Sequence, residues 1–252
     1  MMSDMGQRNR SKPWWAKTWG GAPTWGWLAI AVGVVGVSAI IIAAAARPAP
    51  SSSIDVAAPT PTVKPLAQKI AFLGDSYTDG AGAESKNQGY TTFALTGGLS
   101  CLISAVYGEA GTGYSNAGSQ GGEPFTERVD QVIEARPDIV VVQGSTNDHN
   151  PQTTQAAANT VFSELRKGLP KATIIALGPV DTPRNTDEAV ISAAIKRAAD
   201  ANDVRFISPM TWVSDRDFLS DGAHVGPAGH QKLGAALRAA LLDVPGVRNC
   251  QA

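Results

Sequence analysis

From residue 66 onward, short apolar runs alternate with longer segments in which apolar residues recur at helical spacing. The short runs predict buried strands at 70–73, 102–106, 139–142, 173–177 and 204–207. The longer segments predict helices at 90–99, 123–135, 151–167, 187–201 and 227–242. Strands that alternate with helices form parallel sheets whose two faces are both covered. The pattern therefore predicts an α/β domain.

The stretch from Gly26 to Ala46 has a different pattern, because it carries no charge and almost no polar side chain. About 20 such residues, at 1.5 Å each, span a hydrocarbon core of about 30 Å. Basic residues precede this stretch at Arg8, Arg10, Lys12 and Lys17. The positive-inside rule then predicts a signal anchor with a cytoplasmic N-terminus and an extracytoplasmic domain. The alternative is a long signal peptide cleaved near Ala43–Ala46.

These patterns divide the chain into four parts. Residues 1–25 form a basic cytoplasmic N-terminus, and residues 26–46 form the transmembrane segment. Residues 47–65 contain five prolines among Ser, Thr and Ala, which is typical of an extended linker. Residues 66–252 are long enough to bury a core of their own. The net charge of −1 gives no reason to expect nucleic acid as a partner.

The chain has two cysteines, Cys101 and Cys250, and neither belongs to a CxxC pair or to a cluster with metal-ligand spacing. A domain outside the cytoplasm meets an oxidising environment, in which distant cysteines commonly pair. We therefore expect a disulfide that ties the C-terminal tail to the segment before the second strand. The alternative is two unrelated thiols.

Small and polar residues follow three of the predicted strands. Gly74 and Asp75 separate Ser76 from the first strand, Gly111 follows the second, and Asn147 follows the third. Ligands of parallel α/β sheets bind beyond the C-terminal ends of the strands. These three residues are therefore expected to lie at the same edge of the sheet, where a site would form.

The residue types suit acyl transfer by a serine. Ser76 could act as a nucleophile, but in a Gly-Asp-Ser-Tyr turn it could also act only as a cap. A serine hydroxyl needs a base, and the base needs a group that orients it. His224 has Asp221 three residues before it, within reach across a turn. His149 is expected at most near the cleft, and His230 to pack on the last helix.

Two further groups could bind a negatively charged oxygen that develops during the reaction. The amide of Asn147 is one candidate, although an Asx turn would also explain this residue. The backbone N–H of Gly111 is the other, and Gly113 is nearly as good a candidate. Sequence spacing alone leaves the choice between the two glycines open.

Taken together, these residues resemble the SGNH hydrolases, also called GDSL esterases or lipases. The resemblance rests on Gly74-Asp75-Ser76-Tyr77, Asn147-Asp148 and Asp221-Gly222-Ala223-His224, in that order, and spans about residues 69–242. Two positions depart from the family pattern. Tyr77 replaces the usual Leu, and Gly144 lies one position earlier than the glycine of a Gly-x-Asn-Asp block.

The resemblance implies a flavodoxin-like three-layer α/β/α sandwich. It also implies a Ser76–His224–Asp221 triad, with an oxyanion hole from the N–H groups of Ser76 and Gly111 and the amide of Asn147. No metal or organic cofactor is expected. The expected function is a membrane-tethered extracytoplasmic serine esterase that hydrolyses small acyl esters, such as acetylated glycans or lipid esters of the envelope.

Three other functions are compatible with parts of the pattern. An acyltransferase would form the same acyl-enzyme and pass the acyl group to an envelope glycan. A non-catalytic envelope-binding module would keep the fold without turnover. A nucleotide-binding flavodoxin-like protein would share the alternating pattern of strands and helices, but no phosphate-binding Gly-x-Gly-x-x-Gly or Walker motif follows the first strand.

Overall fold

The computed structural model describes residue 13, residues 17–23, 26 and 29–32, and residues 67–250. The chain divides into two compact units, Met1–Val63 and Lys64–Ala252. In the first unit, strands β1 (Thr18–Trp19) and β2 (Ala22–Pro23) pair antiparallel. Within the described ranges no helix has the length and apolar character needed to cross a bilayer. Most of the expected membrane segment 26–46, and all of the linker 47–65, lie outside those ranges.

The second unit is built on a five-stranded parallel sheet with the order β4-β3-β5-β6-β7. Its strands are β3 (Lys69–Gly74), β4 (Ile103–Gly108), β5 (Ile139–Gln143), β6 (Thr173–Leu177) and β7 (Arg205–Ile207). Every neighbouring pair is parallel. The chain reverses its direction of growth between β3 and β5, which is the position where such sheets bind ligands.

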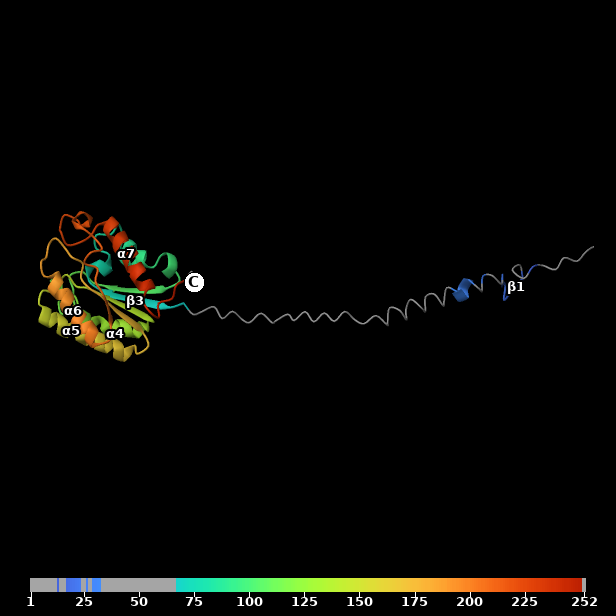
Figure 1. Ribbon diagram of the computed structural model, residues 1–252, viewed down its shortest axis with the longest axis horizontal. Helices are drawn as coiled ribbons and strands as arrows, with labels where there is room; N and C mark the ends of the chain where they lie inside the picture. Colours follow the sequence, from blue (N-terminus) through green and yellow to red (C-terminus); the bar gives the residue numbers. More distant parts are fainter. Residues whose placement is uncertain (1–12, 14–16, 24–25, 27–28, 33–66, 251–252) are drawn as a thin grey trace, which may run out of the picture. The chain divides into compact units, whose positions relative to one another are not determined.

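Helices cover both faces of this sheet. The long helices are α4 (Phe125–Ala135), α5 (Pro151–Gly168), α6 (Glu188–Ala201) and α7 (Pro227–Leu242). Short ones are α2 (Ser76–Asp79), η2 (Lys86–Gln88), α3 (Tyr90–Ala94), η3 (Gly97–Leu99) and η4 (Asp215–Asp217). Figure 1 shows α4, α5 and α6 on one face and α7 on the other. The unit is therefore an α/β/α sandwich.

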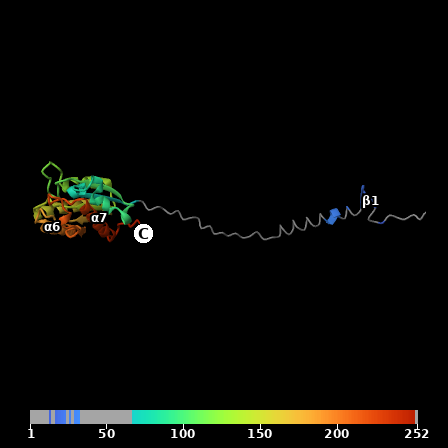
Figure 2. The same ribbon diagram turned by 90° about the horizontal axis from the view of Figure 1, so that it is seen from above.

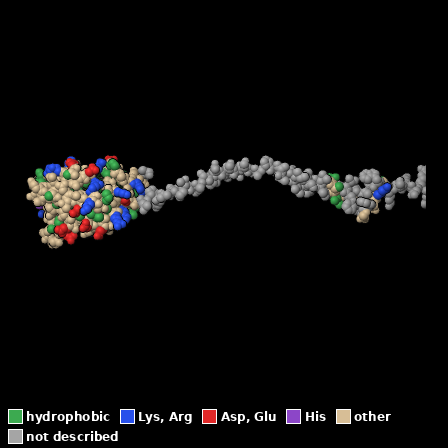
Figure 3. Space-filling view, turned by 90° about the horizontal axis from the view of Figure 1, so that it is seen from below, with side chains coloured by type: hydrophobic (Ala, Val, Ile, Leu, Met, Phe, Trp, Pro, Cys, Tyr) green, Lys and Arg blue, Asp and Glu red, His purple; other side chains and the backbone are tan. Residues whose placement is uncertain are grey.

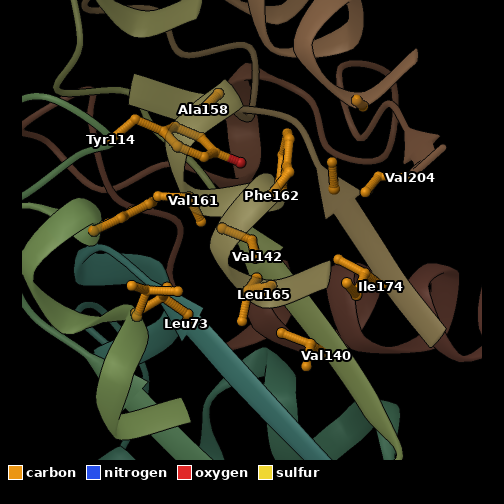
Figure 4. Close-up of a cluster of buried hydrophobic side chains, with 14 of the residues drawn as sticks. Leu73, Tyr114, Val140, Val142, Ala158, Val161, Phe162, Leu165, Ile174 and Val204 are labelled. Carbon is orange, nitrogen blue, oxygen red and sulfur yellow. The ribbon is translucent and has the colours of Figure 1, made fainter. Parts of the chain in front are cut away.

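The alternation of side chains along the central strands explains the two helical layers. Leu73, Val140 and Val142 point to one face, where they pack with residues of α4, α5 and α6 (Figure 4). Their neighbours Phe72 and Val141 point to the other face, toward α3 and α7. All five residues of β5 are buried. A strand that is buried on both faces explains the continuous apolar run seen in the sequence.

The predicted strands and long helices are confirmed to within a few residues, with one difference. The helix expected over 90–99 ends at Ala94 and is followed by the separate 3₁₀ turn η3. Gly97 there has φ of +57°, a left-handed conformation that a continuous α-helix cannot contain. The sequence also gave no sign of the short helix α2, which begins at Ser76 itself.

The C-terminal tail lies beside the beginning of β3 (Figures 1 and 2). The amide of Gln68 donates to the carbonyl of Gly246, and its oxygen accepts the N–H of Arg248. Cys101 and Cys250 are joined by a disulfide, with 5.7 Å between their Cα atoms. The bridge fastens the tail to the segment that enters β4, at the edge of the sheet opposite the C-terminal strand ends.

Candidate active site

Ser76 sits in a sharp turn between β3 and α2. The strand ends at Gly74, where an added Cβ would lie 2.1 Å from the hydroxyl oxygen of Thr78, so only glycine fits. Asp75 caps the helix, because its Oδ1 accepts the N–H of Tyr77 at 2.9 Å. Ser76 is the first residue of α2 and its side chain is 4% exposed. The turn therefore presents the Ser76 hydroxyl at the C-terminal edge of the sheet.

His224 reaches this hydroxyl from a loop that is 148 residues further along the chain. Its Nε2 lies 3.1 Å from Oγ of Ser76. Its Nδ1 lies 2.7 Å from Oδ2 of Asp221. When Nδ1 carries the ring proton and donates it in a hydrogen bond to the carboxylate, Nε2 is left with a lone pair that can accept the serine proton. The three side chains thus form a continuous chain of hydrogen bonds.

The Asp221 carboxylate is held by its own loop. Its Oδ1 accepts the N–H groups of Ala223 and His224, at 2.9 and 3.0 Å. Gly222, which lies between Asp221 and Ala223, has φ of +63°, which favours glycine at that position. Hydrogen bonding from the His224 imidazole, with help from these N–H groups, lowers the pKa of Asp221 to about 2. The carboxylate is therefore ionised at any pH near neutrality.

Asn147 lies across the cleft, in the loop that follows β5. Its Nδ2 donates one hydrogen to the carbonyl of Thr112 at 2.8 Å. Its backbone N–H donates to the hydroxyl of Ser145 at 2.9 Å, so the side chain and the backbone are both fixed. An amide nitrogen carries two hydrogens, and the second remains available to a ligand.

The structure separates the two candidate glycines. Gly111 lines the same cleft as Ser76 and Asn147 and has φ of +80°, and its N–H makes no hydrogen bond within the described residues. The N–H of Gly113 instead donates to the carbonyl of Asn116 at 2.8 Å. A Cβ on Gly113 would lie 2.5 Å from Oδ2 of Asp148. Gly113 is thus a packing glycine, and the N–H of Gly111 is the one open to a ligand.

Arg128 of α4 supports the loops that carry the cleft residues. This role was not predicted from the sequence. Its side chain is 4% exposed. Its guanidinium donates to the carbonyl oxygens of Gly74, Tyr107 and Glu123 and to the hydroxyl of Thr112. It thereby ties the strand before Ser76 to the loop that anchors Asn147. A single Arg on the polar side of a helix pattern gives no signal of such a role.

Asp148 is a second residue whose role the sequence did not reveal. Its side chain is buried and accepts the N–H groups of Tyr114 and Ser115 and the hydroxyl of Ser115. It fixes the loop between β4 and α4 against the loop that carries Asn147. Asn150, two residues further along, caps α5, because its side chain accepts the N–H groups of Gln152 and Thr153.

The open cleft has a volume of about 270 Å³ and a mostly polar lining. The residues along its wall are Ser76, Ala110, Gly111, Thr146, Asn147, His149, Arg184, Asn185, Ala223 and His224. His149 is exposed at this wall, and its Nδ1 lies 2.9 Å from Oδ2 of Asp187. His230 is buried away from it, between the N–H of Tyr90 and the carbonyl of Ala81.

The structure therefore brings together Ser76, His224, Asp221, Gly111 and Asn147, whereas Gly113 and His230 are not part of the cleft lining. Ser76 and His224 are in contact, Asp221 holds His224, and Gly111 and Asn147 line the same cleft. In the described part of the chain no group of His, Cys, Asp and Glu side chains could hold a metal ion. The arrangement can transfer a proton from a hydroxyl to an imidazole beside several unpaired N–H donors.

Comparisons with known proteins place the domain among hydrolases. The model of the GDSL-like Lipase/Acylhydrolase family matches residues 72–232. Among curated proteins, none matches the sequence. Similar solved structures have the same fold at low identity, as three examples show.

The carbohydrate acetylesterase Est24 from Sinorhizobium meliloti is 15% identical, with a TM-score of 0.60 over 69% of this chain and 98% of that one. A family two carbohydrate esterase from Clostridium thermocellum is 20% identical, with a TM-score of 0.62 over 73% and 66%. The M. Smegmatis aryl esterase is 15% identical, with a TM-score of 0.59 over 70% and 99%.

Proposed function

Because the chain belongs to the GDSL-like lipase/acylhydrolase family and is a carboxylic ester hydrolase, we propose that it hydrolyses short-chain acyl esters with Ser76 as the nucleophile. The observation that carries this proposal is the unbroken contact from Ser76 through His224 to Asp221. The nucleophile and the base are within hydrogen-bond reach, and a third group orients the base.

In the first half of the reaction, Oγ of Ser76 attacks the ester carbonyl carbon while its proton moves to Nε2 of His224. The carbonyl π electrons move to oxygen, which becomes a tetrahedral oxyanion. His224 then gives the proton to the leaving alcohol oxygen as the carbon–oxygen bond breaks. Asp221 stays ionised and stabilises the imidazolium that exists in between. The product is an ester between the acyl group and Ser76.

In the second half, a water molecule attacks the acyl carbon and gives its proton to His224. The second tetrahedral intermediate collapses, the acid leaves, and the proton returns to Oγ of Ser76. In both halves the oxyanion is bound by the N–H groups of Ser76 and Gly111 and by the free amide hydrogen of Asn147. One such donor typically contributes about 2.7–4 kcal/mol to transition-state stabilisation.

The cleft supports a short acyl group and a polar alcohol. Apart from Ala110 and Ala223, the lining residues that the structure describes are glycine or polar residues, with no Leu, Ile, Val, Met, Phe, Tyr or Trp among them. A long acyl chain would gain little from burial there, at about 0.8 kcal/mol for each buried CH₂. Two structural relatives are carbohydrate esterases, which agrees with an acetylated glycan as the substrate.

The N-terminal sequence supports a location outside the cytoplasm. The uncharged stretch of residues 26–46 follows a basic segment and precedes a proline-rich linker. We propose that it anchors the domain to the outer face of the cell membrane. Protein that stays in the membrane pellet after alkaline carbonate extraction supports the anchor. A mature N-terminus after residue 43, found by Edman sequencing, shows cleavage and contradicts it.

The enzymatic proposal is tested with the purified full chain and p-nitrophenyl acetate. Ser76→Ala should lower kcat by about 10⁴-fold or more, because the acyl-enzyme can no longer form. Ser163→Ala, on the exposed side of α5, removes the same hydroxyl group elsewhere and should keep wild-type kcat. Equal activity of the Ser76→Ala variant and the wild type would reject the mechanism.

A further inference from the structure

Arg184 lies in the wall of the cleft, in the segment between β6 and α6. Its backbone N–H donates to the carbonyl of Gly222 at 3.1 Å, so this segment is attached to the loop that carries Asp221 and His224. Its neighbour Asn185 donates from its side-chain amide to the carbonyl of Thr146 at 2.9 Å. Arg184 is therefore held between the two loops that form the cleft, and its side chain is exposed.

Arg184 is the one residue with a permanently charged side chain among the lining residues that the structure describes. No Asp or Glu is among the lining residues that the structure describes. The two lining histidines each have a carboxylate of their own, since His149 contacts Asp187 and His224 contacts Asp221. Arg184 has no ion pair with any residue in the described part of the chain. A guanidinium remains charged at every relevant pH, so Arg184 gives the wall of the cleft a permanent cation that no carboxylate contacts within the described residues.

This charge is local, because residues 67–250 contain 20 Asp and Glu but only 15 Lys and Arg, a net charge of −5. The net charge of the chain is −1, and the face seen in Figure 3 carries both basic and acidic side chains. A general attraction of polyanions would need a broad basic surface. A single guanidinium beside the reacting serine instead acts on one group of a bound ligand. Its planar pair of N–H donors matches a carboxylate or a phosphate in two parallel hydrogen bonds.

We propose that Arg184 forms an anion subsite, and that the preferred substrate is a short-chain ester of an alcohol that carries a carboxylate or phosphate near the esterified hydroxyl. This inference rests on the proposed function and adds the class of substrate to it. Acetylated uronic acids and acetylated sugar phosphates both have this chemistry. The remaining polar groups at the wall, Thr146, Asn185 and His149, are placed to contact other hydroxyls of such a sugar.

The test uses the full chain and measures its kcat/KM with matched substrates. Acetylated glucuronate and acetylated glucose differ only in a carboxylate in place of CH₂OH, and acetylated glucose 6-phosphate adds the phosphate case. Wild-type kcat/KM should be about 10-fold or more higher for the charged sugars, and the larger of the two values identifies the preferred anion. Raising NaCl from 50 to 500 mM should reduce this preference, because salt screens the attraction.

Two variants decide whether Arg184 is responsible. Arg184→Gln should lower kcat/KM about 10–100-fold more for the charged sugars than for acetylated glucose, as expected for a lost charge-assisted hydrogen bond. Lys171→Gln removes a positive charge at the other edge of the sheet, in a hollow near Asp138. It should change kcat/KM by no more than about twofold for the charged sugars and for acetylated glucose. An equal loss for charged and neutral sugars in Arg184→Gln overturns the inference.

Failure of this inference is distinguishable from failure of the proposed function. Wild-type turnover of p-nitrophenyl acetate and of acetylated glucose without preference for the charged sugars overturns the anion subsite alone. Absence of turnover with every ester, by a protein that is folded, overturns the esterase proposal and the anion subsite with it.

Discussion

The phenol of Tyr77 donates a hydrogen bond of 2.5 Å to the carbonyl oxygen of Ala223. Tyr77 directly follows Ser76, and Ala223 directly precedes His224, so this bond connects the two loops that bear the proposed nucleophile and base. The ring of Tyr77 is buried, 6.1 Å from the imidazole of His224 between centroids. Leucine, the residue that SGNH hydrolases usually have here, could fill the space but could not hold the Ala223 carbonyl.

We therefore predict that Tyr77→Phe lowers kcat about 3–10-fold and leaves KM within about twofold, because a lost hydrogen bond of about 0.5–1.5 kcal/mol loosens the approach of His224 to Ser76. Tyr90→Phe is the matched control, since it removes a buried phenol that contacts Thr78 and not the His224 loop. Both variants should lose similar stability in urea unfolding. Equal kcat values for the two would contradict the positioning role of Tyr77.

A second prediction concerns the pH dependence of stability. Burial raises the pKa of Asp75 from 3.8 to about 6, against the opposing effect of the hydrogen bond from Tyr77. The folded state thus binds a proton more tightly than the unfolded state does. The resulting stability is fully present below about pH 3.8 and is lost as the pH rises through about 6, by up to about 3 kcal/mol.

Asp75→Asn keeps an acceptor for the N–H of Tyr77 but cannot ionise. Between pH 4 and pH 7.5 the free energy of unfolding should therefore fall less for Asp75→Asn than for the wild type. The difference between the two falls should reach up to about 3 kcal/mol. Urea titrations at intervals across this range measure the difference. Parallel curves for the two proteins would show that the Asp75 carboxyl does not titrate abnormally.

A third prediction concerns Arg128. Arg128→Met should reduce the free energy of unfolding by about 3 kcal/mol or more, because it removes the hydrogen bonds from the buried guanidinium to Gly74, Tyr107, Glu123 and Thr112. It should also lower kcat in the protein that remains folded, since Gly74 precedes the Ser76 turn. Arg205→Met, on an exposed position of β7, is the control and should change the free energy of unfolding and kcat only slightly. A folded Arg128→Met protein with wild-type kcat would rule out a role in positioning.

A fourth prediction separates stability from activity. The Cys101–Cys250 disulfide joins residues 149 apart, and a loop of this length stabilises a fold by about 3–5 kcal/mol in chain-entropy models. The double variant Cys101→Ser, Cys250→Ser should lose stability of this order in urea unfolding. Because the bridge lies at the edge opposite the cleft, kcat/KM below the unfolding transition should change by less than about twofold. A loss of activity in folded protein would show that the tail influences the site.

Local patterns predicted the sheet, and long-range contacts explain what they missed. The apolar run 139–142 indicated a buried strand. The run is continuous because both faces of β5 are covered, and all of its residues are buried. The break after Ala94 depends on Gly97, whose left-handed conformation no apolar period can reveal. Likewise, Arg128 has no local signature, because its partners come from three separate segments of the chain.

The candidate site shows the same division. Asp221 and His224 are three residues apart, so their pairing follows from local spacing. The contact between His224 and Ser76 joins residues 148 positions apart, and only the family resemblance suggested it. The choice of Gly111 over Gly113 needed the contacts of each N–H. Arg184 was not expected at all, because its place in the cleft depends on a loop that meets Gly222 through space.

The central claim is that the hydroxyl of Ser76 is activated by His224, and labelling with a fluorophosphonate ester tests it most directly. The full chain should take up one equivalent of the label, which tandem mass spectrometry should locate on Ser76. His224→Ala should react at least about 10²-fold more slowly, and Ser76→Ala not at all. Label on another residue, or equal rates with and without His224, would contradict the account.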